Sequence, residues 1–161
     1  GDVYKRQTTT SQQHNWILFR YAEILLNYAE AMVNAYGDPD YTGSYSLSAR
    51  DAVNQVRNRG DVKMPAYPTD MKKDAFLKRL RNERRVEFAF EGQRFWDLRR
   101  WKELDNMQNI YKVKVVKQTD GTIQYTKVLH ATYNIQDKMY FYPISNTELF
   151  KNHKLVQNTG W

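Results

Sequence analysis

Acidic and basic side chains alternate in one short stretch of the sequence, and such groups either pair with one another or carry acid–base chemistry. Glu83, Glu87 and Glu91 recur every four residues, so a helix would place them on one face. The stretch also holds basic and aromatic residues and one further acid, namely Arg84, Arg85, Arg94, Trp96, Asp97, Arg99 and Trp101. Because guanidinium groups bind carboxylates through two parallel hydrogen bonds, the pattern predicts an ion-paired structural network beside an aromatic cluster.

The catalytic alternative for these carboxylates is general acid and base chemistry on a glycoside. That chemistry needs two carboxyl groups about 5 to 9.5 Å apart that face each other across a cleft. Carboxylates on one helix do not face each other, and Asp97 would have to complete the pair. The sequence also lacks a glycine-rich phosphate loop, a serine elbow and a metal-binding motif. We therefore expect a protein that is not an enzyme and has no catalytic residue, metal site or cofactor.

Four tyrosines gather in and beside expected loops, at Tyr36, Tyr41, Tyr45 and Tyr67. A tyrosine ring can stack on a sugar while its hydroxyl group forms hydrogen bonds outward. Loop tyrosines also commonly cover the edge of a core, so packing is the alternative role. Tyr41, Tyr45 and Tyr67 are the candidate ligand-binding residues.

Composition narrows the class of protein. The 161 residues are 41% hydrophobic and 14% aromatic, which suits one folded domain. The net charge is +7, but 25 basic residues are interleaved with 18 acidic ones and no basic run exceeds two residues. We therefore expect no nucleic-acid partner. The sequence contains no cysteine, and no apolar stretch approaches the about 18 residues of a membrane span.

Helical periodicity dominates the first sixty residues. Apolar residues recur at helical spacing over residues 16–36 without an internal proline or glycine. Turn-forming residues fill 37–43, and a second helix is expected over 48–59, where Ser48 is a candidate N-cap and Gly60 stops the helix. Two helices joined by a short loop form a hairpin of the kind that tetratricopeptide-like solenoids repeat.

A third helix is expected to begin at a cap provided by Thr69 or Asp70 and to reach Phe90, before Gly92 ends it. Residues 93–102 then predict a short helix that carries the aromatic part of the charged stretch. The residues further on have a different character, with fewer helical signals and more β-branched side chains.

A β-hairpin is expected next, because residues 111–116 and 122–129 are rich in β-branched and aromatic side chains and flank the turn pair at 120–121. Residues 139–142 form a short apolar run that Pro143 stops, which predicts an extended buried segment. Ser145 has the spacing of a capping box with Glu148 and predicts a brief helix.

Several motifs resemble the SusD/RagB family in the same order along the chain. Residues 20–31 resemble a late solenoid helix of that family, and residues 53–59 resemble its partner helix. Residues 83–101 are similar to the family's glutamate- and arginine-rich segment with its phenylalanine, tryptophan and aspartate cluster. Residues 142–144 and 157–161 resemble the family's C-terminal ending. Two positions depart from it, because Ser145 and Thr159 stand where the family commonly has proline.

The resemblance implies a mainly α fold of tetratricopeptide-like helical hairpins, with a less regular C-terminal part that contains a small β-hairpin. It also implies an outer-membrane lipoprotein on the cell surface of Bacteroidota-type bacteria. Such a protein captures glycans or other nutrients and delivers them to a SusC-like TonB-dependent transporter. The lipid anchor would be the protein's link to the membrane and lies outside this sequence.

Domain organisation follows from the same reasoning. Residues 1–7 resemble the translated end of a sequencing adapter, and we expect them not to be native. Residues 8–161 are then the C-terminal portion of a SusD/RagB-like domain.

Two other functions compete with nutrient binding. The helical hairpin alone is compatible with a peptide-binding scaffold, and abundant carboxylates and aromatic rings leave a carbohydrate-active enzyme as the lesser alternative.

Overall fold

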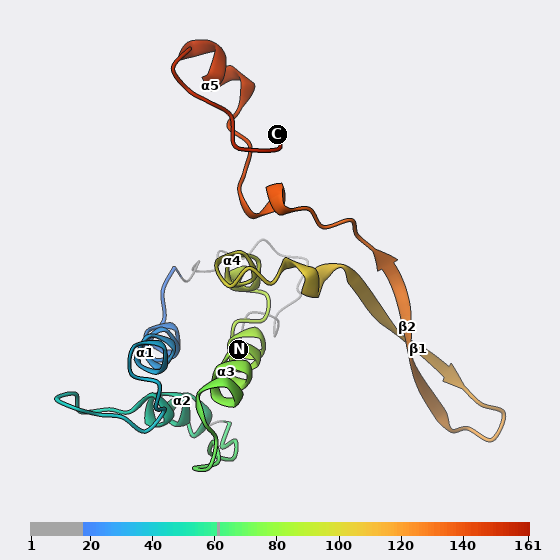
Figure 1. The fold of residues 1–161 in the computed structure, drawn as a ribbon. Coiled ribbons are helices and arrows are strands. Elements are labelled where there is room, and N and C mark those ends of the chain that lie inside the picture. Colours follow the sequence, from blue (N-terminus) through green and yellow to red (C-terminus); the bar gives the residue numbers. More distant parts are fainter. Residues whose placement is uncertain (1–17, 61) are drawn as a thin grey trace, which may run out of the picture. The chain divides into compact units, whose positions relative to one another are not determined.

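The structure is a computed structural model that describes residues 18–60 and 62–161. It consists of two compact units, the first ending at Val86 and the second running from Glu87 to Trp161. Figure 1 shows helices in the first unit, and short helices, a β-hairpin and less regular segments in the second. The predicted fold class, mainly helical with one small antiparallel hairpin, is confirmed.

Three helices build the first unit, α1 (Tyr21–Tyr36), α2 (Ala49–Arg57) and α3 (Lys73–Glu87). Helices α1 and α2 pack together. Each helix buries apolar side chains at helical spacing, as its amphipathic pattern predicts. The buried apolar residues of these helices are Leu25, Leu26, Ala29, Met32, Val33, Ala49, Ala52, Val53, Val56, Phe76 and Leu80.

The ends of α1 and α2 have identifiable causes. Helix α1 stops at Gly37, which has the left-handed φ of 77° and donates its N–H to the Val33 carbonyl at 2.9 Å. Helix α2 starts at Ser48, whose hydroxyl accepts the Asp51 N–H while the Asp51 carboxylate accepts the Ser48 N–H. This capping box confirms the predicted cap. The expected start of α1 at residue 16 lies outside the described residues, and residues 18–20 precede the helix.

Helix α3 begins later and ends earlier than the sequence predicts. The expected caps, Thr69 and Asp70, lie in a turn, because Arg50 draws the carbonyls of residues 68, 69 and 71 into tertiary hydrogen bonds instead of helical ones. The helix ends at Glu87 rather than at Phe90, which takes a positive φ of 67° in the following turn. Both predicted boundaries are therefore wrong.

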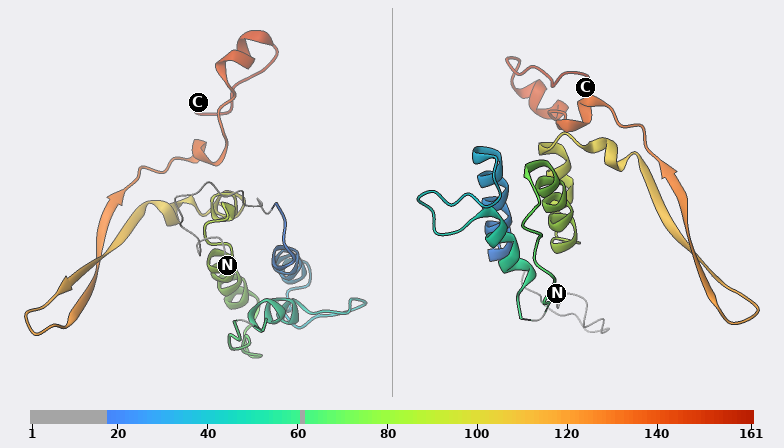
Figure 2. Two further views of the ribbon diagram at one scale, coloured as in Figure 1. Left: turned by 180° about the vertical axis from the view of Figure 1, so that it is seen from behind. Right: turned by 60° about the horizontal axis from the view of Figure 1, so that its bottom comes forward.

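The second unit opens with α4 (Gln93–Arg100), followed by the 3-10 helix η2 (Leu104–Met107). Strands β1 (Asn109–Lys117) and β2 (Ile123–Thr132) then pair in antiparallel register, and Figure 2 shows them from two further directions. In their turn, Gly121 has a φ of 86° that side chains strongly disfavour. The predicted hairpin is confirmed.

Residues beyond the hairpin form the 3-10 helix η3 (Asp137–Tyr140) and the short helix α5 (Asn146–Lys151). The prediction of an extended buried segment over 139–142 is wrong in two respects, because Tyr140 closes η3 and the side chains of Phe141 and Tyr142 are exposed. There the Tyr140 hydroxyl accepts the Leu104 N–H at 3.2 Å, a tertiary contact that local sequence does not reveal. Helix α5 forms as expected, but the Ser145 side chain makes no capping hydrogen bond. Within the described ranges, no helix has both the length and the apolar character needed to cross a membrane.

Candidate functional site

Three tyrosines form an exposed cluster at the loop between α1 and α2. The rings of Tyr36 and Tyr41 stack with centroids 4.1 Å apart and planes inclined by 23°. The ring of Tyr45 lies 6.2 Å from that of Tyr36, and the two hydroxyl oxygens are 3.3 Å apart. All three side chains are exposed. The structure thus brings together the predicted candidates Tyr41 and Tyr45 and adds Tyr36 from the last turn of α1.

The loop that carries this cluster extends away from α1 and α2 in the views of Figures 1 and 2. Gly43 has a φ of 52°, and a Cβ atom there would lie 2.5 Å from the Tyr41 hydroxyl oxygen. The chain therefore folds closely over the Tyr41 ring, which only glycine permits. At the end of the loop, the Tyr28 hydroxyl donates to the Leu47 carbonyl at 2.5 Å. These contacts hold the aromatic rings in place before any ligand arrives.

One hydroxyl group of this cluster, that of Tyr36, has a perturbed pKa. The hydrogen bond with Tyr45 raises the pKa of Tyr36 above its ordinary value, and repulsion between the two tyrosine groups acts in the same direction. Neutral phenol groups both donate and accept hydrogen bonds. The cluster therefore offers ring faces and hydroxyl groups together, which suits a ligand with ring C–H groups and hydroxyl groups.

Tyr67 does not join the cluster. Its side chain is 2% exposed and packs edge-on against Phe76, with ring centroids 5.5 Å apart. The guanidinium carbons of Arg57 and Arg79 lie 5.0 and 4.7 Å from its ring centroid, and its hydroxyl is 3.3 Å from the Glu83 carboxylate. Burial raises the pKa of Tyr67 well above its ordinary value. The structure gives this candidate a packing position rather than a surface.

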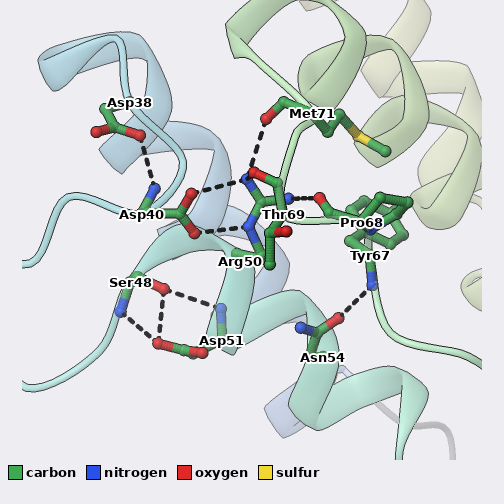
Figure 3. A network of polar contacts seen from close by, with 10 residues as sticks. All are labelled: Asp38, Asp40, Ser48, Arg50, Asp51, Asn54, Tyr67, Pro68, Thr69 and Met71. Atoms are coloured by element: carbon green, nitrogen blue, oxygen red, sulfur yellow. Dashed lines mark hydrogen bonds and ion pairs between the residues drawn. The ribbon is translucent and has the colours of Figure 1, made fainter.

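Arg50 is the centre of the polar network in Figure 3. This buried side chain pairs with both oxygens of the Asp40 carboxylate, at 2.6 and 2.9 Å. It also donates to the carbonyls of Pro68, Thr69 and Met71. The guanidinium therefore joins the loop before α2 to the segment before α3, and its donors are satisfied as a buried cation requires. This network is structural, and it lies at the base of the tyrosine loop.

The first half of the charged stretch also has structural partners. Glu83 pairs with Arg57 of α2, not with an arginine of its own helix. Arg84 is 3% exposed and donates to the Asn27 side chain of α1 at 2.6 Å. These contacts tie α3 to both other helices of the first unit. Arg85 and Glu91 of the predicted motif lie at the surface, while Glu87 and Arg94 are half-buried.

The second half of the stretch forms α4 and its aromatic surroundings. The buried Asp97 accepts a hydrogen bond from Arg100 at 2.8 Å, and the Arg100 guanidinium lies 4.6 Å from the Trp101 ring centroid. Arg99 stacks on Phe95. Trp96, in contrast, is 57% exposed. The predicted network thus has a buried side around Asp97 and an exposed aromatic side around Trp96.

A second polar surface follows one face of α2. An open hollow of about 590 Å³ is lined by Leu47, Asp51, Asn54, Gln55, Asn58, Met64 and Ala66. Four of these residues, Asp51, Asn54, Gln55 and Asn58, are polar and recur at helical spacing. Their spacing in the sequence is the signal that indicates this polar face. Asn54 has a structural partner, because its side-chain oxygen accepts the Tyr67 N–H at 2.8 Å.

No group of three or more histidine, aspartate or glutamate side chains in residues 18–60 and 62–161 could hold a metal ion. Glu83 and Asp97 each pair with an arginine, so both carboxylates have structural partners. The geometry supports binding by aromatic rings more than acid–base chemistry.

Comparison with known proteins agrees with these features. The SusD/RagB family model, described as the SusD family, matches residues 2–161. A SusD-like protein P38 from Formosa agariphila is 37% identical over 90 residues, which are 52% of this chain and 16% of that protein. A crystal structure of a SusD-like protein from Bacteroides fragilis has a TM-score of 0.74 and 34% identity, over 91% of this chain and 26% of that one. The chain spans about a quarter or less of these relatives and belongs to the SusD/RagB family.

Proposed function

We propose that this chain is part of a cell-surface nutrient-binding protein that captures glycans or other nutrients. The observation that carries the proposal is the exposed cluster of Tyr36, Tyr41 and Tyr45. Membership of a family of SusD-like proteins supports it, because that family is one of binding proteins rather than enzymes. The proposed role is therefore recognition of a ligand without turnover.

The tyrosine cluster has the chemistry that sugars require. A pyranose ring presents C–H groups on its face and hydroxyl groups on its rim, so it fits an exposed ring face that is bordered by hydroxyl groups. Tyr41 and Tyr45 supply such faces, and the Tyr36–Tyr45 hydroxyl pair supplies hydrogen-bonding partners. Because Pro39 is buried and the Gly43 backbone lies against the Tyr41 ring, little ordering is needed on binding.

Delivery is the second part of the proposed function. We infer that the full-length protein is a lipid-anchored outer-membrane protein and passes its ligand to a SusC-like TonB-dependent transporter. Family membership supports this inference. The test is to express the full-length gene together with a gene for a SusC-like transporter. Co-purification from the outer-membrane fraction is expected, whereas a protein confined to the cytosol or inner membrane would contradict the inference.

Binding is tested by calorimetry of this chain with neutral oligosaccharides, using malto-, cello- and xylo-oligosaccharides as probes. Tyr41→Ala and Tyr45→Ala should each weaken binding by about tenfold, because an aromatic contact contributes about 1.5 kcal/mol. Tyr133→Ala is the matched control, since Tyr133 is exposed but lies in the second unit. Equal affinity of all three variants and the wild type would show that the cluster is not the site.

The alternative that the chain is a carbohydrate-active enzyme is tested by measuring the release of reducing ends. Incubation of the chain with the same oligosaccharides should release no new reducing ends. Turnover that Glu83→Gln abolishes, with the fold intact by circular dichroism, would replace the binding role with an enzymatic one.

A further inference from the structure

A second group of aromatic rings lies in the second unit, where α4 meets the segment after η3. The rings of Phe95 and Trp96 meet edge-on with centroids 5.0 Å apart, and the Tyr142 ring lies 6.0 and 6.3 Å from them. Trp96 is 57% exposed and Tyr142 is 58% exposed, whereas Phe95 is half-buried. The exposed rings of Trp96 and Tyr142 therefore lie next to each other, and the half-buried Phe95 ring contacts both of them.

The backbone that carries Tyr142 is held by the C-terminal residues. The Asn158 side chain donates to the Tyr142 carbonyl at 2.6 Å. The Gln157 side chain accepts the Ile144 N–H at 2.8 Å and donates to the Ile144 carbonyl at 2.9 Å. The Trp161 indole N–H lies 3.1 Å from the Phe141 carbonyl. Three side chains thus fix a segment that has no regular structure of its own, so Tyr142 is positioned before binding.

Arg99 brings a positive charge to these aromatic rings, and no acidic side chain of the described residues forms an ion pair with it. Its guanidinium carbon lies 3.5 Å from the Phe95 ring centroid and 5.7 Å from that of Tyr142. One of its terminal nitrogens donates to the Phe95 carbonyl at 3.2 Å, and its buried Nε has no hydrogen-bond partner. Within the described ranges, no carboxylate contacts this guanidinium.

Other arginines of the chain show what is missing at Arg99. Arg50, Arg57 and Arg100 each pair with a carboxylate. A partly buried cation without a counter-charge is unfavourable, because desolvation is not offset by a nearby anion. An anionic group on a bound ligand would supply that counter-charge, and a guanidinium binds a carboxylate through two hydrogen bonds.

We propose that Trp96, Tyr142 and Arg99 form a binding site for a saccharide that bears a carboxylate, such as a uronic acid unit. The sugar ring stacks on the exposed rings of Trp96 and Tyr142, and its carboxylate pairs with Arg99. The site shares no residue with the Tyr36, Tyr41 and Tyr45 cluster and lies in the other unit. The inference rests on the proposed saccharide-binding function for the class of ligand, and on Arg99 for the charge.

Calorimetry with matched probes tests the site. The probes are oligogalacturonate, its uncharged methyl ester and oligoglucuronate, each measured with the whole chain. The wild type should bind both acidic probes at least about tenfold more tightly than the ester, because a charge-assisted pair is worth about 1.5 kcal/mol or more. Absence of this preference would overturn the proposal.

Variants separate stacking from charge. Arg99→Gln should remove the preference for the acid while leaving affinity for the ester unchanged, and Arg99→Lys should restore part of it. Trp96→Ala should weaken both acid and ester by about tenfold, since aromatic stacking does not depend on the carboxylate. Phe150→Ala is the control, because Phe150 is exposed on α5 and has no place in the site.

Three outcomes would count against the site. If Arg99→Gln weakens acid and ester equally, Arg99 only supports the fold, and the proposed charge recognition is wrong. If oligosaccharides bind but only Tyr41→Ala weakens them, this site fails while the proposed function stands. If a thymidine oligonucleotide binds more tightly than either uronate, the aromatic and cationic groups recognise nucleic acid instead. Thermal melting of each variant distinguishes loss of binding from loss of fold.

Discussion

At the scale of single residues, tyrosines that the sequence predicts to have the same role differ in how far their side chains are buried. Tyr45 is exposed beside Tyr36, whereas Tyr67 is enclosed by Phe76 and two arginines. The Tyr67 backbone is itself held against α2, because the Asn54 side chain accepts the Tyr67 N–H. The same residue type therefore has a surface role at one position and a core role at the other.

Substitution of the two tyrosines should reflect this difference. Tyr67→Ala should lower the free energy of unfolding by about 3 to 5 kcal/mol, as removal of a buried aromatic ring does. Tyr45→Ala should change it by no more than about 0.5 kcal/mol, in the range of surface substitutions. Chemical denaturation of both variants measures the contrast. Similar destabilisation by the two changes would contradict the packing role of Tyr67.

The Asp40–Arg50 pair makes stability depend on pH. The hydrogen bond and charge of Arg50 hold the pKa of Asp40 below its ordinary 3.8. Because the folded pKa is depressed, the stabilisation is complete above the unfolded pKa and is lost as the pH falls through the folded value. Asp40→Asn should cost about 1 kcal/mol at pH 7, since the Asp40 side chain is half-exposed.

Melting temperatures between pH 2 and pH 7 check this expectation. The difference between wild type and Asp40→Asn should be constant above about pH 4 and should shrink below it, where Asp40 becomes protonated. Asp105→Asn serves as the control, because Asp105 is exposed in η2 of the second unit. A difference that persists unchanged to the lowest pH would show that charge is not the cause.

At the scale of elements, local capping signals and tertiary contacts share control of where the helices begin and end. Ser48 and Asp51 fix the start of α2 through hydrogen bonds within four residues of each other. The start of α3 instead follows from Arg50, which binds carbonyls about twenty residues away. Short-range signals were therefore sufficient for α2 and misleading for α3.

The capping box of α2 is open to a direct test. Ser48→Ala should lower the free energy of unfolding by about 1 kcal/mol, because the Asp51 N–H then loses its acceptor. Ser46→Ala is the control in the preceding loop, where the side chain is exposed. A denaturant titration that shows equal stability for the two variants would mean that the box contributes nothing.

The β-hairpin has two unlike faces. In the antiparallel register, the apolar or aromatic residues that share one face are Tyr111, Val113, Val115, Ile123, Tyr125 and Leu129, and all are exposed. The opposite face carries Lys112, Lys114 and Thr126 with two half-buried valines. An apolar strip of this kind promotes association in water.

Threonine substitutions on the apolar face should therefore reduce self-association while keeping the strand propensity of the hairpin. Val113→Thr with Val115→Thr is expected to lower light scattering of concentrated solutions. Val116→Thr with Val128→Thr places the same change on the opposite face, where little effect is expected. Equal effects of the two pairs would show that the apolar face does not drive association.

At the scale of the whole molecule, the chain corresponds to about a quarter of the SusD-like structure that it matches. Many large apolar side chains of the described residues are exposed. One group lies at the beginning of α1, where Tyr21 and Ile24 are exposed on the helix and Leu18 is exposed just before it. A surface of this type binds hydrophobic dyes and favours aggregation.

Ile24→Gln should accordingly lower the fluorescence of a bound hydrophobic dye without lowering the melting temperature. The physical reason is that the Ile24 side chain is already in water and contributes little to the core. Leu25→Gln provides the contrast one position along, because Leu25 is buried and a polar group there should unfold the helix packing. A large loss of stability from Ile24→Gln would contradict the exposed position of this side chain.

The sequence by itself determined the helical character of the first unit, the cap at Ser48, the hairpin turn at 120–121 and the family, because each depends on patterns over a few neighbouring residues. Only the tertiary structure decided which arginine meets which acid. It paired Glu83 with Arg57, which is 26 residues away, and left Arg99 beside exposed rings without a carboxylate. Partners so distant along the chain are chosen by the packing of helices, which no local pattern records.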